Sequence, residues 1–106
     1  MEAQLKRGSL EVCVLASLLK EDSYGYKIIQ SLEDVVEISE STLYPILRRL
    51  EANDCLISYS VEHNGRLRKF YSITEKGKDK IKEYLQDFQE LMNIFNYIAK
   101  EVKKDD

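Results

Sequence analysis

The 106-residue sequence has no tryptophan, one histidine, one proline, two cysteines and four glycines. One histidine and two distant cysteines cannot form a closed zinc site, because a structural zinc ion takes four protein ligands. Cys13 and Cys55 lie in apolar stretches, which indicates buried thiols in a reducing cytoplasm rather than a disulfide framework. The sequence also lacks a glycine-rich phosphate loop and a nucleophile paired with a base. We therefore expect neither an enzyme nor a protein with a metal or cofactor.

The longest apolar run covers only residues 12–19 and includes Ser17. A helix needs about 20 apolar residues to span a bilayer, so no membrane partner is predicted. The first residues have no signal-peptide layout, because Glu11 interrupts the apolar core that such a peptide requires. A composition of 43% hydrophobic and 33% charged residues is typical of a globular protein. We expect one compact cytoplasmic unit of this length.

The net charge of −3 hides an uneven distribution of charge along the chain. Residues 41–73 contain five cations and three anions, for a net charge of +2. Residues 21–40 contain one cation and six anions, for a net charge of −5. This change of sign predicts that one face of the protein attracts anions while another repels them.

The N-terminal third of the chain has the apolar spacing of three and four residues that is typical of helices. The sequence predicts a first helix over residues 10–20, with Ser9 as its N-cap. It predicts a second helix over about 24–36, with Ser23 as its cap. Gly25 in the first turn of the second helix costs about 1 kcal/mol relative to alanine. This glycine indicates close backbone packing, for which the first helix is the expected neighbour.

A third helix is expected to begin after Ser39 or Ser41 and to end near Asn53. Pro45 stands in or just after the first turn, where a missing N–H group does least damage. Asn53 is suited to the left-handed conformation that often ends a helix.

The apolar period then changes from that of a helix to that of a strand. Apolar and polar residues alternate over 57–62 and again over 67–73. Asn64-Gly65 between them is the strongest short hairpin signal, and His63 is expected to be a solvated turn residue. Residues 56–73 therefore predict a β-hairpin with a basic tip and a basic return strand.

Thr74 begins a long helix that is predicted to reach about residue 103. Its apolar residues recur at alternating spacings of four and three, which gives three heptads of a and d positions. At ~1.5 Å per residue the helix is ~43 Å long, which is more than a small core can cover. The uncovered stripe predicts a homodimer seam. The predicted seam residues are Ile81, Leu85, Phe88, Met92, Phe95, Ala99 and Val102.

The order helix, helix, helix, hairpin, long helix is that of a winged helix-turn-helix. The predicted fold class is therefore mainly α (α+β), with a winged helix-turn-helix DNA-binding domain over residues 1–73. Residues 74–106 are predicted to form a coiled-coil-like dimerisation helix. Because the positive charge gathers on the third helix and the wing, we expect sequence-specific binding to double-stranded DNA. The alternative is a protein-interaction adaptor of the same fold that does not bind DNA. Pairing of all these cations with acidic side chains would favour the adaptor.

Three segments carry a resemblance to a known family. Tyr24-Gly25-Tyr26 opens the second helix, and residues 41–51 read Ser-Thr-Leu-Tyr-Pro-Ile-Leu-Arg-Arg-Leu-Glu. The wing reads Arg66-Leu67-Arg68-Lys69-Phe70-Tyr71 and continues into Ile73-Thr74-Glu75-Lys76-Gly77. In this order, over residues 8 to about 100, the sequence resembles the PadR-like transcriptional regulators, and its short tail resembles their small subfamily. The resemblance implies a cytoplasmic bacterial homodimer that represses a nearby operon, often in response to phenolic or drug-like ligands.

The resemblance also implies which residues contact DNA. The start of the third helix is expected to meet phosphates and base edges, and at least one of its two arginines to reach the backbone. The wing is expected to contact flanking phosphates or to enter the minor groove. The implied DNA-binding residues are Ser41, Thr42, Tyr44, Arg48, Arg49, Arg66, Arg68 and Lys69.

The effector is the least specified part of the resemblance. Multidrug-sensing members use a tryptophan of the last helix to hold planar ligands, and this sequence has no tryptophan. Other side chains of the long helix would line a hydrophobic cleft between the two long helices and the N-terminal helix. The candidates for a small hydrophobic or phenolic effector are Tyr84, Phe88, Met92 and Phe95, with Tyr97 as a further aromatic.

Overall fold

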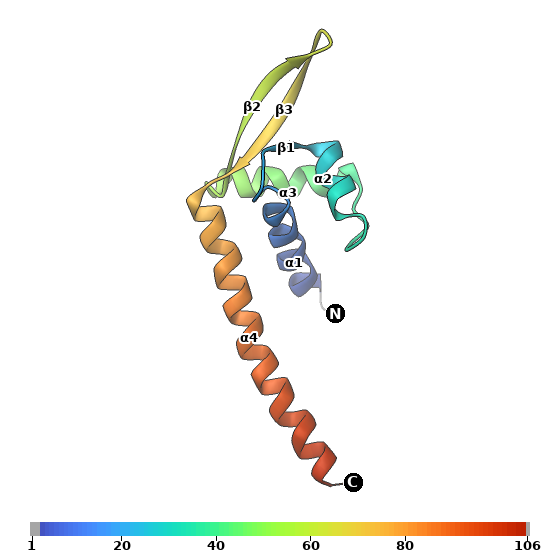
Figure 1. Cartoon of the computed structure of the whole chain (residues 1–106), viewed down its shortest axis with the longest axis vertical. Helices are drawn as coiled ribbons and strands as arrows, with labels where there is room; N and C mark the ends of the chain where they lie inside the picture. Colours follow the sequence, from blue (N-terminus) through green and yellow to red (C-terminus); the bar gives the residue numbers. More distant parts are fainter. Residues whose placement is uncertain (1–2, 106) are drawn as a thin grey trace.

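A computed structural model describes residues 3–105 and confirms the winged helix-turn-helix architecture. The β2–β3 hairpin and the long helix α4 project in opposite directions from a bundle of three helices (Figure 1). The molecule is consequently elongated, with a longest dimension of 67 Å. The described part of the sheet is antiparallel with strand order β1-β3-β2. In chain order the elements are α1 (Ala3–Ala16), β1 (Ser23–Tyr24), α2 (Gly25–Leu32), α3 (Glu40–Ala52), β2 (Leu56–His63), β3 (Arg66–Ile73) and α4 (Glu75–Lys104).

Helix α1 begins and ends earlier than the predicted range 10–20, which was therefore wrong at both ends. Ser9, the predicted N-cap, lies inside the helix, and its hydroxyl is hydrogen-bonded to the hydroxyl of Tyr84 at 2.7 Å. The helix ends at Ala16 because the Ser17 hydroxyl donates to the Val14 carbonyl at 2.6 Å. A side chain that bonds to the helix carbonyls in this way competes with the regular backbone ladder.

Helix α2 is shorter than the predicted range 24–36. Ser23, the predicted cap, instead belongs to β1 and pairs with β3, so Tyr24 precedes the helix. The helix ends at Leu32, and two acidic residues follow directly. Negative charge at a helix C-terminus opposes the helix dipole, which explains why the apolar pattern beyond Leu32 does not continue the helix.

Helix α3 follows Ser39, one of the two predicted caps, and ends at Ala52. The predicted position of the left-handed residue after α3 was wrong by one. Asn53 keeps a negative φ of −94°, and its N–H still bonds to the Arg49 carbonyl. Asp54 takes the left-handed conformation instead, with a φ of 61°.

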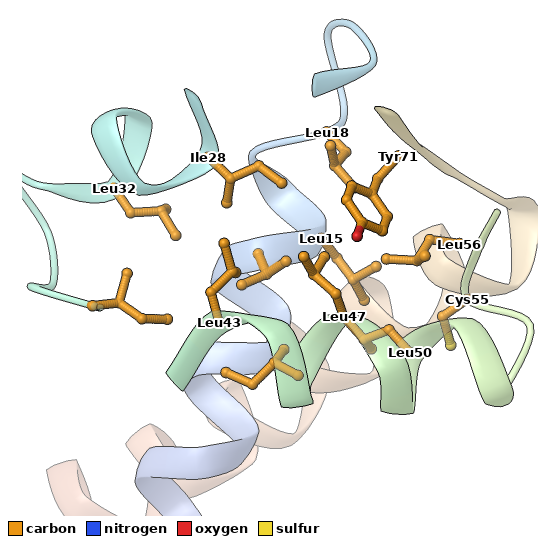
Figure 2. Close-up of a cluster of buried hydrophobic side chains, with 13 residues drawn as sticks. Leu15, Leu18, Ile28, Leu32, Leu43, Leu47, Leu50, Cys55, Leu56 and Tyr71 are labelled. Atoms are coloured by element: carbon orange, nitrogen blue, oxygen red, sulfur yellow. The ribbon is translucent and has the colours of Figure 1, made fainter. Parts of the chain in front are cut away.

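The hydrophobic core lies between the three N-terminal helices and one face of the hairpin. Figure 2 shows leucines of α1 and α3 meeting Ile28 and Leu32 of α2 and Tyr71 of β3. Cys55 and Leu56 close the same cluster at the start of β2, and Cys55 is buried as expected. Cys13 is only partly buried. Alternate residues of β3 face this core, which sets the hairpin at a defined angle to α3.

The junction between the wing and α4 is held by Thr74 and Gly77. The Thr74 hydroxyl caps α4 by accepting a hydrogen bond from the Gly77 N–H at 3.1 Å. The same hydroxyl donates to the Asp54 carbonyl at 2.6 Å. Gly77 is buried, and an added Cβ would overlap the Cys55 carbonyl oxygen and lie 2.7 Å from Cγ1 of Ile73. The start of α4 is thus packed backbone-to-backbone against Asp54 and Cys55, the residues that link α3 to β2.

We expect Gly77→Ala to lower the free energy of unfolding by about 2–3 kcal/mol, because overpacking against a backbone carbonyl outweighs the better helix propensity of alanine. Urea denaturation followed by circular dichroism measures this change. Lys76→Ala, at an exposed position of the same turn, serves as the control. A Gly77→Ala protein as stable as the wild type would contradict this packing.

Tyr71 is the basis of a pH prediction. Burial raises the pKa of its phenol, the charge of Glu51 and that of the neighbouring phenol of Tyr44 when it is ionised raise it further, and Arg48 opposes them. A raised pKa in the folded state means that the contribution of Tyr71 to stability is complete below pH 10, the ordinary pKa of tyrosine, and is lost as pH rises through the folded value. We expect Tyr71→Phe to be less sensitive to pH above 10 than the wild type, as measured by thermal unfolding across that range. An equal loss of stability in both proteins would rule this out.

Candidate nucleic-acid interface

A hollow of about 480 Å³ lies between the start of α2, the first turns of α3 and strand β3. It brings together three of the predicted DNA-binding residues, Tyr44, Arg68 and Lys69, from two separate elements. Two cations and several tyrosine rings in an open hollow form a surface suited to an anionic ligand. The other lining residues are Tyr24, Gly25, Tyr26, Glu40 and Tyr71.

A row of aromatic rings positions Arg68. Its guanidinium carbon lies 4.2 Å from the centre of the Tyr24 ring, within the range of a cation–π contact. Tyr24 packs edge-on against Phe70, with ring centres 5.4 Å apart, and Phe70 stacks on Tyr59 at 5.8 Å. The row crosses all three strands, one ring from each. Sequence reasoning missed the row, because β1 is distant from the hairpin in the chain and its Tyr24 was predicted to open a helix.

The far end of this row is tied to the segment before β1. The Tyr59 hydroxyl donates a hydrogen bond to Asp22 at 2.6 Å, and this bond raises the pKa of Tyr59. Because a hydrogen bond and two ring contacts hold the row in place, the ring on which Arg68 stacks is fixed in position.

Gly25 allows Tyr44 to approach the beginning of α2. A Cβ atom at position 25 would lie 2.7 Å from the Tyr44 hydroxyl oxygen. The close neighbour of this glycine is therefore α3, and the expectation that it would be the first helix was wrong. The glycine places the Tyr44 hydroxyl inside the hollow, where half-exposure leaves it accessible.

Ser41 and Thr42 form an exposed group of hydroxyls at the start of α3. The Ser39 hydroxyl does not cap the helix N–H groups but lies 2.9 Å from the Ser41 hydroxyl and 3.2 Å from that of Thr42. Hydroxyls and N–H groups at a helix N-terminus are suited to hydrogen bonding with phosphate oxygens.

The two arginines of α3 have different surroundings. Arg49 forms an ion pair with Glu11 of α1 at 3.1 Å, and the other oxygen of Glu11 lies 3.4 Å from Lys80 of α4. Arg48 is exposed and close enough to Tyr71 to lower the pKa of that phenol. Within residues 3–105, Arg48 has no acidic partner in an ion pair. Arg49 thus links α3 to α1 through Glu11, whereas in the described part of the chain the guanidinium of Arg48 is free to bind an anionic ligand.

The wing tip carries Arg66 in an exposed position. Arg66 lies opposite His63 in the β2–β3 register, next to the Asn64-Gly65 turn. Both turn residues have positive φ, of 52° and 79°, as the predicted hairpin turn requires. Lys69, two positions before Tyr71 on the same face, lies above the Tyr71 ring, with its ammonium nitrogen 5.7 Å from the ring centre.

On α4, the predicted seam separates into a covered and an uncovered part. Ile81 packs against the core, and Tyr84 is anchored by its bond to Ser9. Farther along, Phe88 is 49% exposed and Phe95 is 60% exposed. The exposed apolar side chains also include four that lie off the predicted a and d positions. These additional residues are Leu91, Ile94, Tyr97 and Ile98.

The additional residues make the apolar face of α4 wider than a two-stranded seam. When Phe88 and Phe95 are taken as d positions of the heptads, Leu91 and Ile98 are g positions. They therefore flank the a and d positions of the seam. Apolar residues at a, d and g are typical of a helix that packs against more than one neighbour. Over residues 3–105, no helix has the length and apolar character needed to cross a membrane.

Known proteins are similar to this chain in sequence and in fold. The family model described as the transcriptional regulator PadR-like family matches residues 14–83, which include α2, α3, the hairpin and the start of α4. A PadR-like transcription factor from Bacteroides fragilis is 38% identical and superimposes with a TM-score of 0.81, covering 91% of this chain and 95% of that one. The transcriptional regulator Rv3488 of Mycobacterium tuberculosis is 29% identical over 89 residues, 83% of each chain.

A more distant structure shows the same fold. Bacillus subtilis PadR in complex with operator DNA is 22% identical, with a TM-score of 0.66 over 72% of this chain and 46% of that one. The match to the family model covers more than half of the chain, in the region that carries the hollow and the wing. The chain therefore belongs to the PadR-like family of transcriptional regulators, and it is a regulator of transcription rather than an enzyme.

Proposed function

We propose that this protein is a cytoplasmic, homodimeric repressor that binds operator DNA through α3 and the β2–β3 wing. The observation that carries the proposal is the hollow in which Tyr44 of α3 and two cations of β3 share one surface. A second copy would present the same surface again, and a palindromic operator would be read by two α3 helices one helical turn, or ~34 Å, apart. The relative solved with operator DNA has this fold, which supports the proposal.

Within this proposal the predicted DNA-binding residues divide by role. Arg48, Arg66 and Lys69 are exposed cations without acidic partners in the described chain, so they are assigned to phosphates. Arg68 is assigned to a phosphate beside the groove, because stacking on Tyr24 holds its guanidinium in one position. Arg49 is assigned to bracing α1 against α3 through Glu11 rather than to DNA. Ser41, Thr42 and Tyr44 retain their assignment to phosphates and base edges.

The adaptor alternative depends on the cations being paired with acids. Of Arg48, Arg49, Arg66, Arg68 and Lys69, only Arg49 has an acidic partner among residues 3–105. A surface that retains four unpaired cations on α3 and β3 is suited to a polyanion. This observation favours DNA over a protein partner.

The homodimer is proposed from the exposed face of α4. Each large apolar side chain left in water forgoes about 1.5–3 kcal/mol of burial. A second α4 would cover the predicted seam, and the g positions would require a further helix of the partner. In this division, the DNA-binding domain over residues 1–73 is separate in function from the dimerisation helix over 74–106. Residues 1, 2 and 106 lie outside the described structure.

A hydrophobic effector site is proposed between the paired α4 helices. Phe88, Met92 and Phe95 would line it, and Tyr84 would stand at its inner end, where its hydroxyl already bonds to Ser9. Thermal shift measurements with a series of planar aromatics and phenolic acids test this site. A ligand that raises the melting temperature of the wild type, and not that of Phe95→Ala, supports it. No shift with any compound removes its support.

Fluorescence anisotropy with a labelled duplex from the protein's own promoter region tests the proposed function. A scrambled duplex of the same length and composition is the control. We expect the promoter duplex to bind about 1,000-fold more tightly or better at physiological salt. Transcription in vitro from the same promoter should fall as protein is added. Equal binding of the two duplexes at every salt concentration, by a folded protein, would refute the proposal.

A further inference from the structure

We propose that Glu40, the first residue of α3, determines specificity by accepting a hydrogen bond from the exocyclic amino group of a cytosine in the major groove. This inference rests on the proposed DNA-binding function and adds a base-reading residue to it. Neither the helix periodicity nor the family resemblance assigned a role to Glu40.

The position of Glu40 is the first observation. It lines the same hollow as Tyr44, Arg68 and Lys69, at the N-terminal end of α3. Tyr44 lies one helical turn after it on the same face, so both side chains project toward the hollow. A ligand that fills the hollow would therefore meet this carboxylate together with the two cations.

The lack of a partner is the second observation. Glu40 is exposed, and among the side chains described for residues 8–105 its carboxylate has no hydrogen-bond or ion-pair partner. Other glutamates of the same domain are engaged. Glu11 holds Arg49 and Lys80, and Glu51 accepts a hydrogen bond from the Ser58 hydroxyl at 2.5 Å. Although two cations line the same hollow, Glu40 forms an ion pair with neither of them.

Chemistry limits what an unpaired carboxylate can do on a DNA-binding surface. It is repelled by phosphate, and ionised it can only accept hydrogen bonds. In the major groove the amino groups of cytosine and adenine are the donors, and the carboxylate of Glu or Asp pairs with that of cytosine. Adenine suits Gln or Asn better, because their amide group can donate to N7 while accepting from the amino group. Arg68 and Lys69 would hold the backbone on either side and offset the repulsion.

Selection of binding sites from a random duplex library tests the assignment with three proteins. The wild type is expected to enrich a palindromic motif with a C·G pair at one position of each half-site. Glu40→Ala should lose the preference at that position alone, with discrimination falling about fivefold or more. Glu40→Gln should change the preferred base there from cytosine to adenine.

Glu37→Ala is the matched control, since it removes an equal charge from an exposed residue three positions earlier, in a different hollow with Glu33. It should leave the motif unchanged. If both Glu40 variants select the wild-type motif, the inference is overturned, whatever happens to overall affinity. If the wild type enriches no motif, the proposed function itself has failed, and this outcome is distinct from the first. Thermal unfolding of each variant separates base reading from a contribution of Glu40 to the stability of α3.

Discussion

Replacing Phe88 with glutamate is expected to convert the protein into a monomer and to weaken operator binding by about 100-fold or more. Phe88 is 49% exposed in the single chain and is one of the two phenylalanines of the proposed seam. A carboxylate there would have to be buried beside its copy in the partner, which costs several kcal/mol per charge. Loss of the dimer removes the advantage of binding two half-sites at once, which is about 10²–10⁴-fold.

Sedimentation velocity and anisotropy on the same samples measure both effects. Gln86→Glu is the matched control, because it adds the same charge two residues earlier at an exposed position off the seam. It should remain dimeric and bind normally. A Phe88→Glu protein that is folded and still dimeric would show that α4 does not form the interface. The proposed spacing of two α3 helices on DNA would then have no basis.

The second large effect is expected from removing three of the four unpaired cations together, in Arg48→Ala/Arg66→Ala/Lys69→Ala. Each phosphate contact contributes ~0.9 to the slope of log K against log salt concentration. Three contacts in each of two subunits predict a slope smaller by about 5. Affinity at low salt should fall by orders of magnitude, for specific and scrambled duplexes alike.

Arg49→Ala is the control for this experiment, because it removes a cation that is bound to Glu11. Its salt slope should match that of the wild type, while its stability falls by no more than about 1 kcal/mol. If Arg49→Ala reduced the slope by the ~0.9 per subunit of a phosphate contact, the assignment of Arg49 to Glu11 rather than to DNA would be wrong. Anisotropy titrations between about 50 and 200 mM salt, the range over which such contacts change affinity strongly, distinguish these outcomes.

Several features could be predicted from the sequence because each depends on residues close together in the chain. The Asn64-Gly65 turn and its flanking alternation defined the hairpin over residues 56–73. The spacing from Ile81 to Val102 predicted α4 almost to its last residue. Thr74 was correctly identified as the start of that helix. In each case the signal is local, so one sequence without relatives contains it.

The errors came from places where tertiary contacts override local preference. Ser9 and Ser23 are good capping residues by type, yet the first lies inside α1 and the second in a strand. The stability of α1 comes from packing, which extends the helix past a favourable cap. Ser23 lies in β1, where it pairs with Tyr71 of β3 at the edge of the sheet. Neither partner is near in sequence, so no local pattern announces it.

The candidate site divides in the same way. The sequence by itself determined the fold, the long apolar helix and the set of candidate cations, because apolar periodicity and charge are properties of the sequence alone. Only the tertiary structure decided that Arg49 is bound to Glu11 whereas Arg48 is not. It also decided that Arg68 stands on rings from three strands and that Glu40 enters the same hollow without a partner. The reason is physical: whether a charge is available depends on what folding brings within about 4 Å of it, and that distance is a property of the fold.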